Sequence, residues 1–120
     1  MIWVDSAKRF LSALISQDEE IIIGMLSDSA EWYHWHNHAV GKYKIIETNR
    51  RFMEIANEVA IRINNTAYRD KFVCLECELH YNPIVNIDKY IKNGISMSVV
   101  YIIEFDDWGK IQFIRSYKRK

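Results

Sequence analysis

The chain has 120 residues, of which 49% are apolar, and 16 basic and 16 acidic side chains give it a net charge of zero. This length supports one domain with its own core, residues 1–120, and is too short for two. A neutral chain whose only basic cluster lies in its last residues, from Arg115 to Lys120, is not expected to bind nucleic acid through a basic face.

The first residues and the two cysteines bear on location. The chain reaches the acidic Asp5 before any long apolar run, and no apolar stretch is long enough to span a membrane. Cys74 and Cys77 fall in a segment that is typical of a strand, where a spacing of three sends the two sulfurs to opposite faces. We therefore expect free thiols rather than a redox pair or half a zinc site, and a cytoplasmic protein with no membrane contact.

Two helices are predicted first. Asp5 is a candidate cap for a helix that runs to about Ile15, because apolar residues recur there at helical spacing. Ser16 and Glu19 have the spacing of a capping box, which predicts a second, shorter helix with Ser16 at its cap. Residues 27–29 are expected to end this helix.

A strand predicted from Ala30 to about His36 begins the most distinctive motif, three histidines at alternate positions. If the strand continues, alternation places His34, His36 and His38 on one face. Histidine titrates near neutrality, so this cluster beside aromatic residues is interpreted as the wall of a small-molecule pocket. A metal site with Glu31 or another acid as a further ligand is not favoured, because residues two apart on a strand diverge, His38 lies past Asn37 in an expected turn, and no clear acid or cysteine partner is present. We expect neither a metal nor a cofactor.

The remaining chain is predicted as one helix and a sheet. Gly41 ends a loop, and a third helix runs from about Lys42 to Glu58 with an apolar stripe on one side. Four antiparallel strands then follow, with residues 84–93 unassigned, and the helices must cover one face of their sheet. These strands span Val59 to Arg69, Lys71 to Asn82, Ile95 to Phe105 and Lys110 to Lys118.

Alternation assigns the faces of the strand from Ile95 to Phe105. Glu104 marks the outer face, so Tyr101 and its alternate neighbours face the core. The outer face also carries Val100 and Ile102, which would leave apolar area in water. An apolar exposed sheet face usually indicates a partner, so we expect a homodimer through this face. The same reasoning on the preceding strand places His80 at the surface.

The order of elements resembles the nuclear transport factor 2-like cone, which includes ketosteroid isomerases, SnoaL-like polyketide cyclases and scytalone dehydratase. The resemblance covers nearly the whole chain. It implies an α+β fold, in which a cone-shaped, curved antiparallel sheet wraps around three N-terminal helices and leaves an apolar pocket. The residues that carry it are Ala13-Leu14, Gln17-Asp18, Leu26, Asp28, Ala30, Trp32, Gly41 and the turn Trp108-Gly109-Lys110-Ile111.

The resemblance also implies where a site would lie. Counting from Ala13, His34 falls where those isomerases hold an aspartate base. Counting back from Gly109, Tyr101 falls where they hold a protonated aspartate that donates to the oxyanion. Their oxyanion tyrosine corresponds to Phe10, which cannot donate, so steroid isomerisation itself is not expected.

The residues themselves support a candidate site. A neutral His34 is a candidate base and the Tyr101 phenol a candidate oxyanion donor, although a buried tyrosine satisfied by a neighbour is an equal alternative. The first hypothesis is a cofactor-independent isomerase, cyclase or dehydratase that moves a proton on a small apolar carbonyl compound. The alternative is a non-catalytic ligand-binding or protein-interaction module. The predicted pocket lining consists of Phe10, Leu14, Trp32, His36, Phe52, Met97 and Val99.

Overall fold

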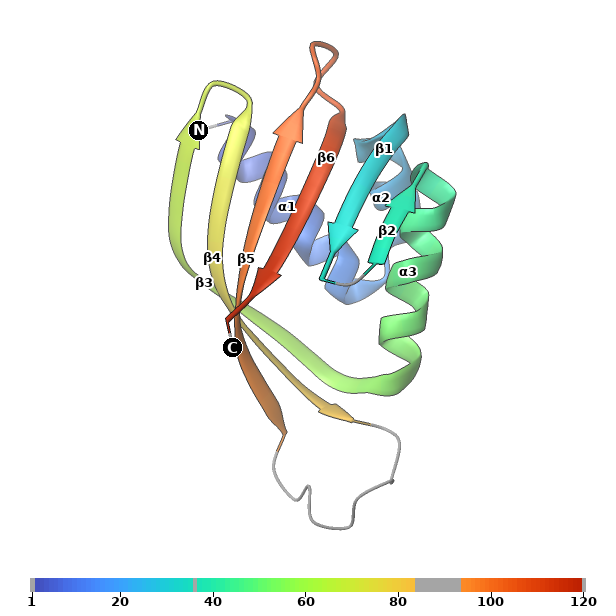
Figure 1. Cartoon of the computed structure of the whole chain (residues 1–120), viewed down its shortest axis with the longest axis vertical. Helices are drawn as coiled ribbons and strands as arrows, with labels where there is room; N and C mark the ends of the chain where they lie inside the picture. Colours follow the sequence, from blue (N-terminus) through green and yellow to red (C-terminus); the bar gives the residue numbers. More distant parts are fainter. Residues whose placement is uncertain (1, 36, 84–93, 120) are drawn as a thin grey trace.

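The computed structural model describes residues 2–35, 37–83 and 94–119. Within these residues, three helices and six strands form an α+β domain (Figure 1). The strands make one sheet in the order β2-β1-β6-β5-β4-β3. In chain order the elements are α1 (Ile2–Ser16), α2 (Glu19–Met25), β1 (Leu26–His34), β2 (Asn37–Val40), α3 (Lys42–Ile55), β3 (Ala56–Arg69), β4 (Phe72–Pro83), β5 (Ile95–Phe105) and β6 (Ile111–Lys118).

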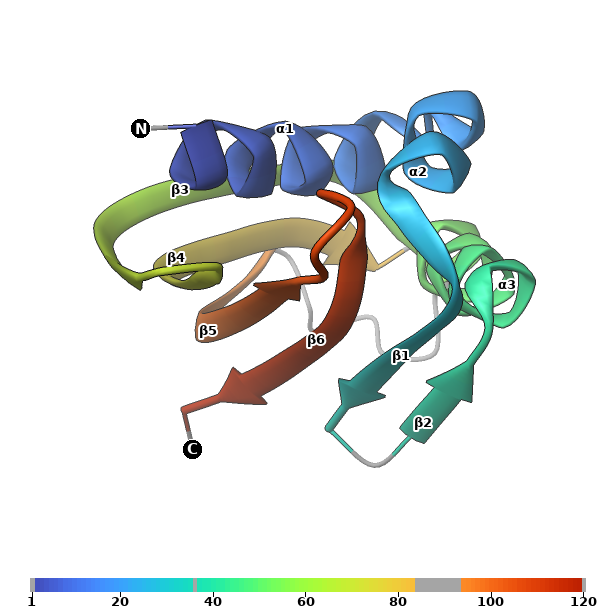
Figure 2. The same ribbon diagram turned by 90° about the horizontal axis from the view of Figure 1, so that it is seen from above.

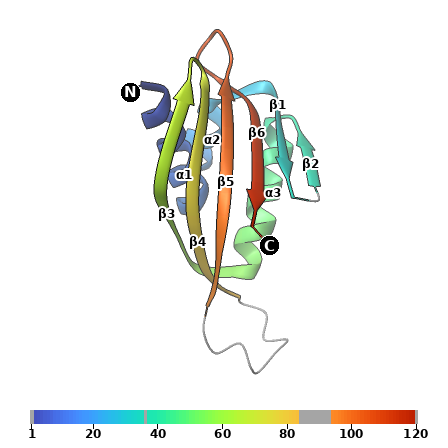
Figure 3. The same cartoon turned by 60° about the vertical axis from the view of Figure 1, so that its left-hand side comes forward.

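The sheet curves around its helices, as predicted. Seen from above, α1 lies across one face of the sheet and α3 lies beside β1 and β2 (Figure 2). In the turned view α1 passes behind β3 and β4, while α3 runs along the opposite half of the sheet (Figure 3). None of the helices in the described ranges is both long and apolar enough to cross a membrane.

The first two helices differ from the prediction at their ends. α1 begins at Ile2, so Asp5 lies in its first turn and is not its cap. The cap of α2 is Asp18, whose carboxylate accepts a hydrogen bond from the Ile21 amide at 3.3 Å. Gln17 has a left-handed backbone (φ 57°), which separates the two helices and moves the cap two residues beyond Ser16. Residues 27–29 do not end α2, because α2 stops at Met25 and they belong to β1.

The histidine motif is divided by a turn. Trp35 has a left-handed backbone (φ 49°), and the chain then returns as β2, antiparallel to β1. Tyr33 pairs with His38, and directly paired residues share a face, so His38 lies on the face opposite to His34. The prediction of one shared face is therefore wrong for His34 and His38, because alternation requires extended backbone throughout. His36 lies outside the described residues.

The sheet is mixed rather than antiparallel. β3, β4, β5 and β6 are antiparallel neighbours, as predicted, but β1 pairs with β6 in parallel. This pairing joins segments about 80 positions apart in sequence, for example Trp32 with Ile114. No local sequence pattern predicts it. The α3 helix also ends at Ile55, earlier than the predicted Glu58, and its last predicted turn belongs to β3. The unassigned segment 84–93 lies outside the described residues.

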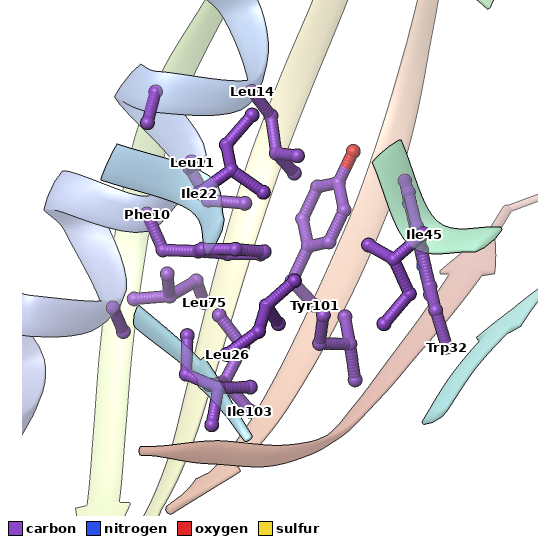
Figure 4. Close-up of a cluster of buried hydrophobic side chains, with 14 of the residues drawn as sticks. Phe10, Leu11, Leu14, Ile22, Leu26, Trp32, Ile45, Leu75, Tyr101 and Ile103 are labelled. Atoms are coloured by element: carbon purple, nitrogen blue, oxygen red, sulfur yellow. The ribbon is translucent and has the colours of Figure 1, made fainter. Parts of the chain in front are cut away.

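The core lies between the concave face and the helices. Alternate residues of β4 and β5 point into it, as predicted, and His80 is exposed. Figure 4 shows Phe10 and Leu11 of α1 packed toward Leu75 and Ile103 of the sheet, with Tyr101 farther along the same face. These side chains are buried, so the sheet and α1 form one continuous support for the site.

Candidate functional site

His34 and Tyr101 lie in one row across the sheet. Ser116 of β6 pairs with Tyr101 of β5 on one side and with His34 of β1 on the other. Paired residues point to the same face, and neighbouring strands are about 4.8 Å apart. The backbones of His34 and Tyr101 are therefore separated by roughly 10 Å, a span that one small molecule can bridge.

Both side chains line an apolar space, here called the inner cavity, of about 30 Å³. It holds about two water molecules, since one water needs some 10–15 Å³ on this measure. Five of the predicted site residues line it: Leu14, Trp32, His34, Phe52 and Tyr101. Trp35, Thr48 and Asn49 also line it, together with further apolar side chains from α1, α3, β3 and β4.

Three predicted lining residues lie elsewhere. Phe10 is fully buried in the core between α1 and the sheet, and Val99 of β5 is buried in the same core. Met97 is half-buried and pairs with Leu79 of β4, near the start of β5. On this strand only the long Tyr101 side chain reaches the inner cavity. Facing the core was a correct inference for Val99 and Met97, but it does not place a residue at the cavity.

A second, larger space adjoins the first. The outer cleft has a volume of about 650 Å³ and lies between the β1–β2 hairpin and α3. His34, Trp35, Thr48 and Phe52 line both spaces. These four side chains, here called the partition, therefore separate an apolar interior from an open cleft.

His34 is held in an aromatic stack. Its ring lies 4.7 Å from that of Trp32 and 4.1 Å from that of Trp35, measured between ring centroids. The Lys118 ammonium lies 5.0 Å from the Trp35 ring. Burial, and secondarily the positive charge of Lys118, lower the pKa of His34 to about 4. His34 is therefore neutral at physiological pH.

Two buried polar atoms of the partition lack a hydrogen-bond partner among the described residues. They are Nδ1 of His34 and Nε1 of Trp35. An unsatisfied buried polar group costs about 1–3 kcal/mol and is rare in native proteins. The left-handed backbone of Trp35 adds strain, because a bulky residue rarely adopts this conformation. The two unsatisfied polar atoms and the strained backbone thus lie at the same place, the boundary between the inner cavity and the outer cleft.

Tyr101 and Asn49 add two further polar side chains to the lining of the inner cavity. Burial raises the pKa of Tyr101, so its hydroxyl stays protonated and able to donate. Figure 4 shows its ring between Leu14 and Trp32, with the hydroxyl directed away from the strand. The Asn49 amide donates to the Leu14 carbonyl oxygen at 3.0 Å and so joins α3 to α1. None of the described lining residues of the inner cavity is Asp, Glu, Lys or Arg.

Metal ligation gains no support from this geometry. Within residues 2–35, 37–83 and 94–119, no three histidine, cysteine or acidic side chains are placed to hold one ion. His38 instead approaches a Glu31 carboxylate oxygen at 2.8 Å on the outer face. Cys74 and Cys77 are free and lie on opposite faces of β4. That the protein needs no metal or cofactor stays a prediction.

Comparison with known proteins identifies the fold. No protein-family model and no curated protein matches the chain. A structure described as a SnoaL-like polyketide cyclase from Shewanella denitrificans matches with a TM-score of 0.86 at 15% identity, over 98% of this chain and 90% of that one. A Catenulispora acidiphila protein with a ketosteroid isomerase-like fold, in complex with trimethylamine, matches with a TM-score of 0.79 at 10% identity, over 93% and 83%.

An LEH-like epoxide hydrolase from M. tuberculosis also matches, with a TM-score of 0.77 at 19% identity, over 98% of this chain and 82% of that one. At such low identities the likeness concerns the fold alone. The chain has the nuclear transport factor 2-like fold shared by SnoaL-like and ketosteroid isomerase-like proteins, and the predicted resemblance is confirmed at that level. A shared fold does not by itself fix a function.

Sequence reasoning missed Trp35, Thr48 and Asn49. Asn49 carries a usable signal, because it is an amide on an otherwise apolar helical stripe. Trp35 carries none, since its role depends on a left-handed backbone that tryptophan seldom adopts. Thr48 is half-buried on α3 and donates to the Lys44 carbonyl, an ordinary helical contact.

Proposed function

We propose that the chain binds a small, mainly apolar molecule with a carbonyl group, and that His34 moves a proton on it without a cofactor. One observation carries the proposal. A neutral imidazole and a protonated phenol come from strands two apart to one apolar cavity, whose described lining holds no Asp, Glu, Lys or Arg. A base and a donor on opposite sides of a small ligand suit proton abstraction beside a carbonyl.

The chemistry follows from the charges of the two groups. His34 would take a proton from the carbon next to the carbonyl, and the Tyr101 hydroxyl would donate to the oxygen where negative charge develops. Burial disfavours imidazolium and phenolate alike, so both groups start neutral. Proton transfer then creates opposite charges on His34 and the ligand in a site of low polarity, where they stabilise each other.

Ligand entry requires the partition to move. An inner cavity of about 30 Å³ is far below the several hundred Å³ of an ordinary ligand site, whereas the outer cleft is in that range. The ligand would therefore arrive in the cleft and displace Trp35 or Phe52. Side-chain rearrangements of this kind on binding are common.

The alternative is a binding module without catalysis. A pKa near 4 makes His34 a weak base at neutral pH, which favours this alternative. A cytoplasmic location is part of the proposal and remains a prediction from the sequence.

The decisive experiment measures hydrogen exchange on a simple ketone. Butyrophenone in D₂O is incubated with the protein, and loss of the proton next to the carbonyl is followed by NMR. We expect His34→Ala to abolish exchange, and Tyr101→Phe to slow it by about 10²–10³-fold, as for one lost oxyanion donor. His80→Ala is the matched control, because His80 is an exposed histidine that contacts Ser96 and lies outside the cavity.

The outcomes separate the two hypotheses. Binding without exchange supports the non-catalytic alternative. Exchange that survives His34→Ala removes His34 as the base, and failure of the folded protein to bind butyrophenone or related ketones contradicts both hypotheses.

The pH profile of the exchange rate gives an independent check. With a His34 pKa near 4, the rate is expected to stay level from pH 7 to about 5 and to fall as the pH approaches 4, because protonation removes the base. A decline centred near 6.5, the value of an exposed histidine, would show that the titrating base is not this buried one.

A further inference from the structure

The outer cleft differs from the inner cavity in carrying charge. Lys44, Glu47 and Arg51 follow one another along α3 and all line the cleft. The Lys44 ammonium lies 3.1 Å from one oxygen of the Glu47 carboxylate, and the Arg51 guanidinium lies 2.6 Å from the other. One carboxylate is thus shared by two cations, and a positive charge remains uncompensated among them.

The neighbouring charges do not remove this excess. His38 also lines the cleft, but it contacts Glu31 at 2.8 Å on the outer face, and Glu31 itself does not line the cleft. Lys118 places a further cation over the Trp35 ring, on the partition itself. Among the described residues that line the cleft, Glu47 is the one acid, against the two full cations Lys44 and Arg51.

The two cations retain hydrogen-bonding capacity. The Arg51 side chain is 75% exposed, and only one of its terminal nitrogens is seen to contact Glu47. A guanidinium has five N–H donors in a planar fork that matches a carboxylate, so Arg51 can hold a second one. The Lys44 side chain is 67% exposed and has donors to spare.

The inner cavity, by contrast, favours an uncharged group. Its described lining offers no cation, so a carboxylate moved into it would lose its hydration without compensation. A ligand that uses both spaces must therefore be apolar at the end that passes the partition and anionic at the end that stays in the cleft. A cationic ligand would meet Lys44, Arg51 and Lys118 on its way in.

We infer that the ligand is an amphipathic carboxylic acid, whose apolar part occupies the inner cavity and whose carboxylate remains in the outer cleft on Arg51 and Lys44. This inference rests on the proposed function, since it names the class of molecule that the pocket takes. Arg51 and Lys44 then determine specificity without touching the reacting atoms.

The test uses two probes of nearly the same size and shape, of which only one is charged: 3-benzoylpropanoate, an aryl ketone with a carboxylate, and its uncharged amide. Binding of each is measured by isothermal titration calorimetry. We expect the acid to bind at least about five-fold more tightly than the amide, as for one or two exposed charge pairs. Raising the salt concentration should weaken binding of the acid and leave the amide unchanged.

Variants of residues on α3 show which side chain causes the preference for the acid. Arg51→Gln should reduce the affinity for the acid by about five-fold and leave the amide unaffected. Glu47→Gln should increase the affinity for the acid, because it removes the carboxylate that now competes for both cations. Arg50→Gln is the matched control, since the adjacent Arg50 pairs with Glu19 and does not line the cleft.

The outcomes distinguish this inference from the proposed function. Equal binding of acid and amide, unchanged in Arg51→Gln, overturns the inference and leaves the pocket proposal intact. Loss of acid binding in Arg50→Gln as large as in Arg51→Gln overturns it too, because the effect would then be one of overall charge. If neither probe binds the folded protein, the proposed function fails first and the inference fails with it.

Discussion

Trp32 and Trp35 lie three residues apart on one hairpin and have opposite surroundings. Trp32 is 4% exposed, has extended backbone in β1, and donates from Nε1 to the buried Ser116 hydroxyl at 2.7 Å. Trp35 lies in the turn with a left-handed backbone, and its buried Nε1 has no partner among the described residues. Trp32 within β1 is thus satisfied, whereas the last residue of the strand, His34, and the turn residue Trp35 carry the unpaired polar atoms.

This difference distinguishes a residue that supports the candidate site from one that forms part of it. Buried polar groups are normally paired, and exceptions concentrate where a protein binds or reacts. Trp32 fixes the strand that presents His34, and Trp35 covers that histidine at the boundary between cavity and cleft. Measured stabilities of variants at these residues test this division.

The largest expected effect is on the pH dependence of stability. Folded His34 has a pKa of about 4, whereas in the unfolded chain it titrates near 6.5. Between these values the unfolded state binds the extra proton, so stability falls as the pH drops from about 6.5 to 4. The contribution of His34 to this loss is expected to be up to about 3 kcal/mol.

The matched control is His34→Gln, which cannot titrate. Urea unfolding of both proteins from pH 7 to pH 4 isolates the histidine, because every other titrating group is common to them. Parallel stability curves would show that His34 is not held neutral by burial.

The next effect compares the two tryptophans directly. Trp32→Phe removes a buried hydrogen bond and leaves the Ser116 hydroxyl unsatisfied, which should cost about 1–3 kcal/mol beyond the change in packing. Trp35→Phe removes an N–H that has no partner, so its cost should be at least about 1 kcal/mol smaller. Urea denaturation of both variants measures the difference, and equal losses would contradict the division drawn above.

A smaller effect is expected at the start of α2, where a satisfied cap can be compared with the one the sequence suggested. Asp18→Ala removes the acceptor of the Ile21 amide and should cost about 1 kcal/mol. Ser16→Ala should cost less, since Ser16 lies at the end of α1 and only contacts the Ala13 carbonyl at 3.4 Å. Thermal unfolding of the two variants decides between Asp18 and Ser16 as the cap.

The sequence predicted what depends on local pattern. Alternation assigned the inner face of β5, and Tyr101 does reach the cavity, because a regular strand offers only two faces. Alternation does not carry through the histidines, because the chain reverses at Trp35, which itself adopts the left-handed backbone where a glycine or asparagine is usual. His34 does line the cavity, but the shared face for which the motif was singled out does not include His38.

The rest depends on contacts between distant segments. Ser116 brings His34 and Tyr101 into one row only because β1 pairs in parallel with β6. The separation of cavity from cleft needs α3 to lie against the β1–β2 hairpin. Such relations were available from the resemblance in outline, as a cone with a pocket, but not residue by residue.

The smallest effect on folding is expected from the outer face, where the predicted homodimer would form. Ile102 is half-buried there, beside Cys74 on β4 and Arg115 on β6, and Phe72 is 40% exposed on the same face. Ile102→Lys should change the unfolding free energy of the monomer by only about 0.5 kcal/mol, as for a surface substitution, but it should weaken association because a charge would be buried between two sheets. Light scattering at about tens of micromolar measures the mass of the unmodified chain and of the Ile102→Lys variant. A stable dimer needs roughly 1,200–2,000 Å² of buried surface, so a monomeric unmodified chain at that concentration would show that this face does not supply it. Glu20→Lys, a change of charge on α2 away from this face, is the control that should leave association unaltered.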